Sequence, residues 1–324
     1  MKKILGLLAL ILVFSNCDDG DMTIETIDFQ DVQAASCGEI IYKLNGNEAL
    51  YMKIPTAANA FANEITPTDE PRIITIGSSV NVTYRAYNGN VTAANLCNSP
   101  APISPTATTE WTASAGTIEI STIAVYSTPD AVTGATKILK YLHNIVFKNI
   151  VFNKPEGTQV YETFPFGEYA TTATTLPLTF NPDNVAVCPS NQLLYNAGSN
   201  DIEAIYIQNF DSNLLNTSNL GTPKTALISA TSNKLVYRLF ETALTTTNQE
   251  YFCGSSLPST PTVTQEWTAQ NGVADTSGII EVVTTTNGSG FLHTITLKAV
   301  TFQKGNSTFY LGNSIVIGNL LTTN

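Results

Sequence analysis

The chain has two histidines, His143 and His293, and they are its first candidates for proton-transfer chemistry. Each follows a leucine inside a run of β-branched and aromatic residues, a pattern typical of a β-strand. Because side chains alternate along a strand, His143 shares a face with Ile145 and Phe147. These neighbours favour a histidine in the core over a general base. The sequence also has no G-x-S-x-G elbow, no H-E-x-x-H helix and no P-loop.

Four glutamates could serve a glycosidase, which needs two carboxylates across a sugar. They are Glu110, Glu119, Glu266 and Glu281, and they fall at matching places in the two halves of the chain. Residues kept in both halves of a diverged duplication more often hold the shared fold together, so we expect salt bridges or hydrogen bonds beside a buried tryptophan. Catalytic carboxylates remain the alternative. The cations that recur in the same way are Arg85 with Arg238 and Lys148 with Lys298.

The chain has two tryptophans, Trp111 and Trp267, each 14 residues after a cysteine. Exposed on the surface, they would form a platform on which sugars stack, as in carbohydrate-binding modules. Buried, they would fill the core near a disulfide. Burial is the expected arrangement because it is the more common one for large aromatic side chains.

These residues belong to an internal duplication. Matching pairs keep the same order along the chain, at offsets between 150 and 162 residues. We therefore expect a first copy over residues 22–169, a linker over 170–177 and a second copy over 178–324. Further matching pairs are Tyr84 with Tyr237, Cys37 with Cys188, Cys97 with Cys253, Phe152 with Phe302 and Lys154 with Lys304.

The copies differ in the length of two loops. The offset falls from 162 to 150 between Glu119/Glu281 and His143/His293, so the first copy has 12 extra residues within Ile123–Tyr141. The second copy has 6 extra residues around Val273–Gly278, where the offset rises from 156 to 162. Loops tolerate such changes and often carry specificity. Any difference in binding between the copies is expected there.

Each copy has the pattern of an all-β fold. Short β-branched and aromatic runs, such as Val80–Tyr87 and Leu235–Phe240, alternate with turn signals such as Asn45-Gly46 and Asn271-Gly272. One short helix is compatible with Ala57–Glu64. The sequence therefore predicts two tandem β-sandwich-like domains.

Four cysteines sit at matching places in the copies: Cys37, Cys97, Cys188 and Cys253. Three pairings are formally possible, but duplication favours one bridge within each copy, Cys37–Cys97 and Cys188–Cys253, because each domain must fold alone. A zinc site is disfavoured by the lack of a CxxC spacing and the small number of histidines. In immunoglobulin domains the tryptophan lies between the paired cysteines, whereas here it follows the second, so a different topology is expected.

The first residues have the pattern of an export signal. Lys2 and Lys3 precede the apolar run Ile4–Phe14, which is too short for a bilayer span of roughly 20 residues. With Cys17 at the cleavage position, residues 1–16 resemble a lipoprotein signal peptide, although Phe14 and Asn16 depart from the usual residues. The resemblance implies acylation of Cys17. The acidic residues 18–21 resemble the tether of surface-exported lipoproteins in glycan-degrading Gram-negative bacteria.

Composition narrows the function further. The formal net charge is −11, and a polyanion repels nucleic acid, so no nucleic-acid partner is expected. No cofactor or metal motif is present in the sequence. We expect a lipoprotein of the cell envelope, anchored in the outer membrane and facing outside, with a non-catalytic binding or structural role. The sequence does not identify a ligand; any ligand is expected to be a glycan or a protein. The alternatives are a glycan-binding accessory protein of a polysaccharide-uptake system and a carboxylate-dependent glycosidase.

Overall fold

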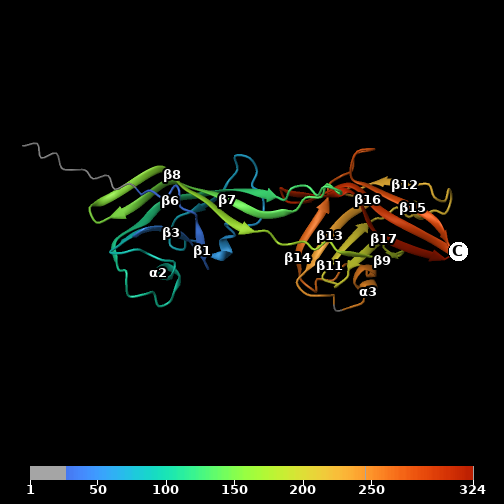
Figure 1. Cartoon of the computed structure of the whole chain (residues 1–324), viewed down its shortest axis with the longest axis horizontal. Coiled ribbons are helices and arrows are strands. Elements are labelled where there is room, and N and C mark those ends of the chain that lie inside the picture. Colours follow the sequence, from blue (N-terminus) through green and yellow to red (C-terminus); the bar gives the residue numbers. More distant parts are fainter. Residues whose placement is uncertain (1–26, 245, 324) are drawn as a thin grey trace, which may run out of the picture.

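The computed structural model describes residues 27–244 and 246–323, which form two antiparallel sheets lying end to end along the longest axis of the molecule (Figure 1). The predicted all-β class with two tandem sandwich-like units is confirmed. The signal segment 1–16, Cys17 and the acidic residues 18–21 lie outside the described residues. Within the described part of the chain, no helix is long and apolar enough to cross a membrane.

The first sheet has the strand order β1-β2-β3-β5-β6-β7-β8, and β4 pairs with β6 off this path. Its strands are β1 Ala35–Cys37, β2 Ile40–Asn45, β3 Glu48–Lys53, β4 Arg72–Thr75, β5 Asn81–Tyr87, β6 Ala107–Tyr126, β7 Ile138–Lys154 and β8 Gly157–Thr172. Trp111 on β6 lies opposite Tyr84 on β5, so the duplicated aromatic residues are direct cross-strand partners.

The second sheet has the order β12-β15-β16-β14-β13-β11-β10-β9, and β17 pairs with β16. Its strands are β9 Phe180–Cys188, β10 Leu193–Gly198, β11 Glu203–Gln208, β12 Lys224–Leu227, β13 Lys234–Phe240, β14 Val263–Ala269, β15 Ile279–Asn287, β16 Gly290–Lys304 and β17 Ser307–Thr323. Trp267 on β14 lies opposite Tyr237 on β13, which repeats the pairing in the first sheet.

A bend in β6 folds the first sheet over its own core. Residues 107–112 of β6 pair with β5 and residues 117–120 pair with β4, and the register with β7 shifts on both sides of Ala115. At the bend Gly116 has a φ of +122°, and a Cβ there would lie 2.8 Å from the Cα of Ile150. Glycine is therefore required at this position. In the second sheet the insertion around 273–278 separates the corresponding residues into two strands, β14 and β15.

A buried polar side chain fastens each sheet at matching positions. Lys43 is 2% exposed and its Nζ donates to the carbonyl of Phe29 at 2.9 Å. Burial lowers the pKa of Lys43. In the second sheet Asn196 donates from Nδ2 to Asn181 O at 2.8 Å and to Ile317 O at 2.6 Å, which joins β9 to β17. The second sheet therefore curls so that β9 and β17, its first and last strands in chain order, are in contact.

The described helices are short, and the helix predicted from the sequence is not among the α-helices. The helix expected over Ala57–Glu64 is instead a 3-10 turn, Thr56–Ala58, which ends at Asn59 in the left-handed region with φ 49°. The left-handed backbone at Asn59 ends the turn and prevents its continuation as an α-helix. Two α-helices that were not predicted, α2 Ala94–Cys97 and α3 Asn248–Cys253, end at the second cysteine of each copy. The capping box of Thr247 and Glu250 at the start of α3 is a sequence signal that could have indicated it.

The predicted disulfides are confirmed. Cys37 is bonded to Cys97 with a sequence separation of 60, and Cys188 to Cys253 with a separation of 65. Each ties an early strand of its sheet to the short helix that follows β5 or β13. Cys188 is fully buried in a small cluster with Tyr195 and other aromatic side chains, apart from the main core of that half.

Candidate functional site between the two sheets

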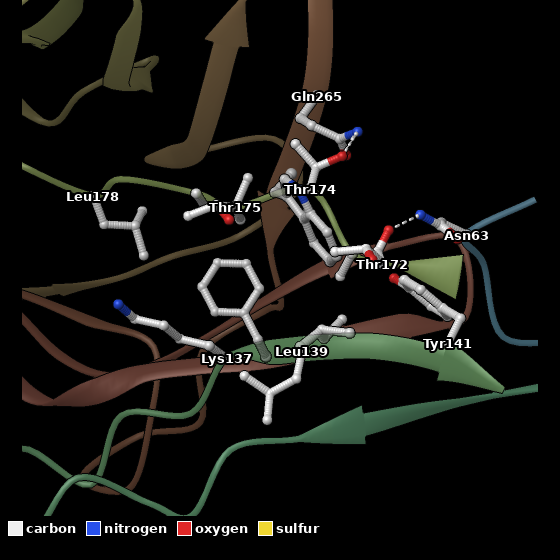
Figure 2. Close-up of a pocket in the computed structure, with 14 residues that line it drawn as sticks. Asn63, Lys137, Leu139, Tyr141, Thr172, Thr174, Thr175, Leu178 and Gln265 are labelled. Carbon is white, nitrogen blue, oxygen red and sulfur yellow. Dashed lines mark hydrogen bonds between the residues drawn. The ribbon is translucent and has the colours of Figure 1, made fainter. Parts of the chain in front are cut away.

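A pocket of about 190 Å³ lies between the two sheets and is lined by residues of both (Figure 2). The start of β7 forms one wall, the connecting segment 172–178 a second, and β14 and β17 a third. Most of its surface is apolar. We name it the inter-sheet pocket; its lining residues are Asn63, Lys137, Ile138, Leu139, Tyr141, Thr172, Ala173, Thr174, Thr175, Leu176, Leu178, Gln265, Trp267 and Phe309.

Hydrogen bonds from Ser307 and its neighbour fasten the two sheets beside this pocket. The buried hydroxyl of Ser307 accepts from the N–H of Ile65 at 3.2 Å and from the hydroxyl of Tyr141 at 3.3 Å. Asn306 donates from Nδ2 to the carbonyl of Ile65 at 3.1 Å. Burial raises the pKa of Tyr141, which keeps its hydroxyl protonated and able to donate. These bonds therefore hold the first and second sheets together next to the pocket.

The insertion that distinguishes the first copy forms a second fastening. It lengthens the β6–β7 hairpin, whose tip lies against β17 of the other sheet. Thr136 donates its N–H to Tyr310 O at 2.9 Å and accepts from the Tyr310 N–H at 3.1 Å. Asn313 donates its N–H to Thr133 O at 2.7 Å. The extra residues thus join the two copies and contribute Lys137 and Leu139 to the pocket.

Both histidines are fully buried and clamped between two threonines, as the alternation pattern predicted for core positions. Thr122 Oγ1 lies 2.8 Å from His143 Nδ1, and Thr171 Oγ1 lies 2.9 Å from Nε2. The second copy repeats the clamp with the same distances, 2.8 Å and 2.9 Å. Its members are Thr284, His293 and Thr322. The clamps connect neighbouring strands of each sheet.

In the first copy the Thr172 carbonyl, through Asn63, determines the direction of each hydrogen bond along the clamp. The carbonyl of Thr172 can only accept, so Asn63 faces it with Nδ2, at 2.9 Å. Asn63 Oδ1 must then accept from Thr171, at 2.6 Å. The Thr171 oxygen is left to accept from His143 Nε2–H, and Nδ1 accepts from Thr122. His143 is therefore the neutral Nε2–H tautomer, linked to two pocket residues, Asn63 and Thr172.

A cation near the other end of the clamp also favours the neutral ring. Arg72 donates from Nη1 to Thr122 Oγ1 at 2.8 Å and from Nη2 to Glu64 O at 2.6 Å. Burial, and after it the charge of Arg72, lowers the pKa of His143 to about 4. Burial, with Lys224 second, lowers the pKa of His293 as well.

Acid should weaken the first sheet through His143. Its pKa is about 6.5 when unfolded and about 4 when folded, so its contribution is complete above pH 6.5 and is lost as the pH falls toward 4. The loss should be about 3 kcal/mol. Urea unfolding followed by Trp111 fluorescence, in a Trp267→Phe background, measures this loss of stability as the pH is lowered from above 6.5 to 4. In His143→Gln this part of the pH dependence should vanish; an unchanged profile would contradict the assignment, and His293→Gln is the matched control.

Three of the four recurring glutamates form ion pairs, as expected. Glu110 lies 2.5 Å from Arg85, and the matching pair Glu266–Arg238 is separated by 2.6 Å. Glu281 pairs with Lys298 at 3.2 Å. Glu119 lies on β6 opposite Val146 of β7. Among the described residues that line the inter-sheet pocket, none is a glutamate or an aspartate.

The duplicated tryptophans are both buried, as expected, at 1% exposure for Trp111 and 4% for Trp267, but their surroundings have diverged. In the first copy Lys154 covers the ring of Trp111, with Nζ 4.1 Å from its centroid. The same ammonium donates to Gln159 at 3.0 Å. Trp111 is not among the residues that line the inter-sheet pocket.

In the second copy two different residues make Trp267 part of a pocket wall. Phe309 stands where the first copy has Gln159, and its ring lies edge-on to Trp267 with the centroids 5.0 Å apart. Lys304, which matches Lys154, donates instead to Gln265 Oε1 at 2.8 Å. The Nε1–H of Trp267 is buried and has no acceptor among the described groups.

A buried carboxylate, Glu203, holds the end of the connecting segment. It is 1% exposed and accepts four hydrogen bonds, from the N–H groups of Leu178 and Thr179 at 2.8 Å, from the Thr179 hydroxyl at 2.8 Å and from the Tyr237 hydroxyl at 2.7 Å. Burial, and then Glu203, raises the pKa of Tyr237. Leu178, which lines the pocket, is thus fixed with a φ of 52°.

The sequence indicates the histidines, tryptophans, glutamates and cysteines as candidate site residues, but it does not indicate the pocket. The structure brings Trp267 alone of the two tryptophans into it, with Tyr141 and Phe309. The described residues contain no cluster of three His, Cys, Asp or Glu side chains able to hold a metal. Comparison of the chain with protein families, with curated proteins and with solved structures gives no match.

Proposed function

We propose that this chain is a lipoprotein of the cell envelope, anchored through Cys17 in the outer membrane and facing outside, with a non-catalytic binding role. The observation that supports a binding role is the inter-sheet pocket, to which both copies and the first copy's insertion contribute. Glu110, Glu266 and Glu281 are engaged in ion pairs within the sheets, and both histidines are held in clamps. The anchor is supported by the resemblance of the first residues to a lipoprotein signal.

Two sheets fastened on either side of a pocket suit such a role. The bonds from Ser307 and from the β6–β7 hairpin limit movement between the sheets, so the pocket walls are preorganised. A preformed site binds with a smaller loss of conformational entropy than one that must be assembled. The acidic residues 18–21 would act as a spacer between anchor and binding unit.

Protease shaving of intact cells tests the location. Blotting should show loss of the full-length protein after shaving, and a Cys17→Ala variant should be shed or mislocalised. Protection in intact cells, with digestion only after lysis, would contradict an outward-facing protein. Normal membrane retention of the Cys17→Ala variant would contradict lipid anchoring.

The buried tryptophans give the glycan-binding alternative little support. Sugars stack on exposed aromatic faces, and the rings of Trp111 and Trp267 are almost completely covered. A panel of oligosaccharides that quenched tryptophan fluorescence at saturable concentrations would restore this alternative.

A further inference from the structure

The size of the inter-sheet pocket restricts what it can bind. Its volume is about 190 Å³. An apolar cavity of about 150 Å³ is enough to hold benzene. A single ring or a chain of roughly eight carbons is therefore the largest apolar body that fits. A polymer could enter only with one end or one side group.

The walls favour an apolar body. Aliphatic side chains come from the hairpin and the connecting segment, namely Ile138, Leu139, Leu176 and Leu178. Tyr141, Trp267 and Phe309 also line the pocket, but each is at most 4% exposed, so they add only a small aromatic area. Contact with such walls removes apolar surface from water at about 25 cal/mol per Å². The hydroxyl groups of a sugar would lose their water here for few partners.

Charge at the pocket selects the polar end of the ligand. Lys137 is the one charged residue among the described lining residues, and its side chain extends along the pocket in Figure 2. Its ammonium forms no ion pair with any described carboxylate. The nearby amide groups of Asn63 and Gln265 are already engaged with Thr171, Thr172, Thr174 and Lys304. An ammonium with free donors favours an anionic oxygen over a cation.

We propose that the inter-sheet pocket binds a small monocarboxylic acid with an apolar body. The body packs against Leu139, Leu178 and Phe309, and the carboxylate lies at Lys137. This inference rests on the binding role proposed above and names the ligand class for the same site. The two copies differ here because Phe309 and Gln265 replace Gln159 and Thr109 of the first copy, which leaves Trp267 at the pocket.

The two tryptophans provide a built-in control for a titration. Each gives one indole N–H signal in a nitrogen–proton NMR spectrum, and only Trp267 lines the pocket among the described residues. The full chain with Cys17→Ala is titrated with octanoate, 1-octanol and octylamine, which share the same chain. Octanoate should move the Trp267 signal and leave that of Trp111 in place. Octanol should bind about threefold more weakly, because an exposed ion pair contributes little, and octylamine more weakly still.

Variants separate the charge from the cavity. In Lys137→Gln octanoate should bind no more tightly than octanol, whereas Lys140→Gln, on β7 outside the pocket, should leave its affinity unchanged. Thr175→Phe should abolish binding of all three probes, because Thr175 lines the pocket and is exposed; Thr158→Phe is its control.

Two results would overturn the inference, and they differ from a failure of the location test. Equal affinity for the three probes, or an unchanged preference in Lys137→Gln, would exclude the carboxylate class while leaving the pocket as a binding site. If no probe moves the Trp267 signal of the folded chain, the pocket is not the binding site. Neither result depends on anchoring, which the shaving experiment tests alone.

Discussion

Replacing Glu203 with alanine should lower the free energy of unfolding of the second sheet by about 4 kcal/mol. The change removes the acceptor for four donors, two of which are backbone N–H groups of Leu178 and Thr179. These N–H groups cannot rotate toward another partner, and a buried donor without an acceptor costs about 1–3 kcal/mol. The Tyr237 hydroxyl also loses its partner in the core.

Urea unfolding followed by Trp267 fluorescence, in a Trp111→Phe background, measures this loss. With a slope of about 2 kcal/mol per molar, the midpoint should fall by about 2 M. Glu203→Gln should recover only part of the loss, because its amide group must face one of the two backbone N–H groups. A midpoint within experimental error of the unmodified chain would show that the network does not stabilise the sheet.

The matching position in the first copy supplies the control. Glu48 accepts from the Tyr84 hydroxyl, as Glu203 does from Tyr237, but it is only partly buried. Glu48→Ala should therefore cost about 1 kcal/mol and should affect the first sheet only. Because Glu203 fixes Leu178, Glu203→Ala should also weaken octanoate binding, whereas Glu48→Ala should not.

Residues that act within one copy were predictable from the sequence. Duplication favours one disulfide within each copy, and strand alternation places His143 on the same face as Ile145. The disulfides, the core histidines and the sandwich-like sheets therefore all follow from local patterns. The recurrence of Glu110 with Arg85 likewise indicated a structural pair, since a shared fold retains what both copies need.

The pocket was not predictable, because it depends on how the copies contact each other. Ser307 and Ile65 have no sequence pattern that joins them across 242 residues. Two signals did exist in the alignment of the copies. The insertion within Ile123–Tyr141 indicated where the copies differ, and the change from Gln159 to Phe309 showed that the surroundings of one tryptophan had become apolar.

The polar clamps show the same division. That His143 is buried follows from alternation along β7, but its partners Thr122 and Thr171 lie on neighbouring strands, and only the register of those strands brings them together. The link onward to Asn63 depends on a loop between β3 and β4, for which strand periodicity gives no information.

Removal of the second disulfide should have an effect of similar size to loss of Glu203. A bridge that closes a loop of 65 residues restricts the unfolded chain and should contribute about 4 kcal/mol. Cys188→Ala with Cys253→Ala also leaves space in a fully packed cluster beside Tyr195 and Phe252, which adds to the loss.

The Trp267 unfolding midpoint in urea should therefore fall by about 2 M or more in this double variant. Cys37→Ala with Cys97→Ala should lower the Trp111 midpoint by a similar loop-closure amount, without the added packing loss, because Cys37 is only partly buried. If either double variant shifted both midpoints equally, the two sheets would unfold as one cooperative unit. That outcome would mean that the bonds at Ser307 and the β6–β7 hairpin contribute a coupling free energy larger than the free energy of unfolding of either sheet alone. The inter-sheet pocket would then be lost when the sheets unfold together.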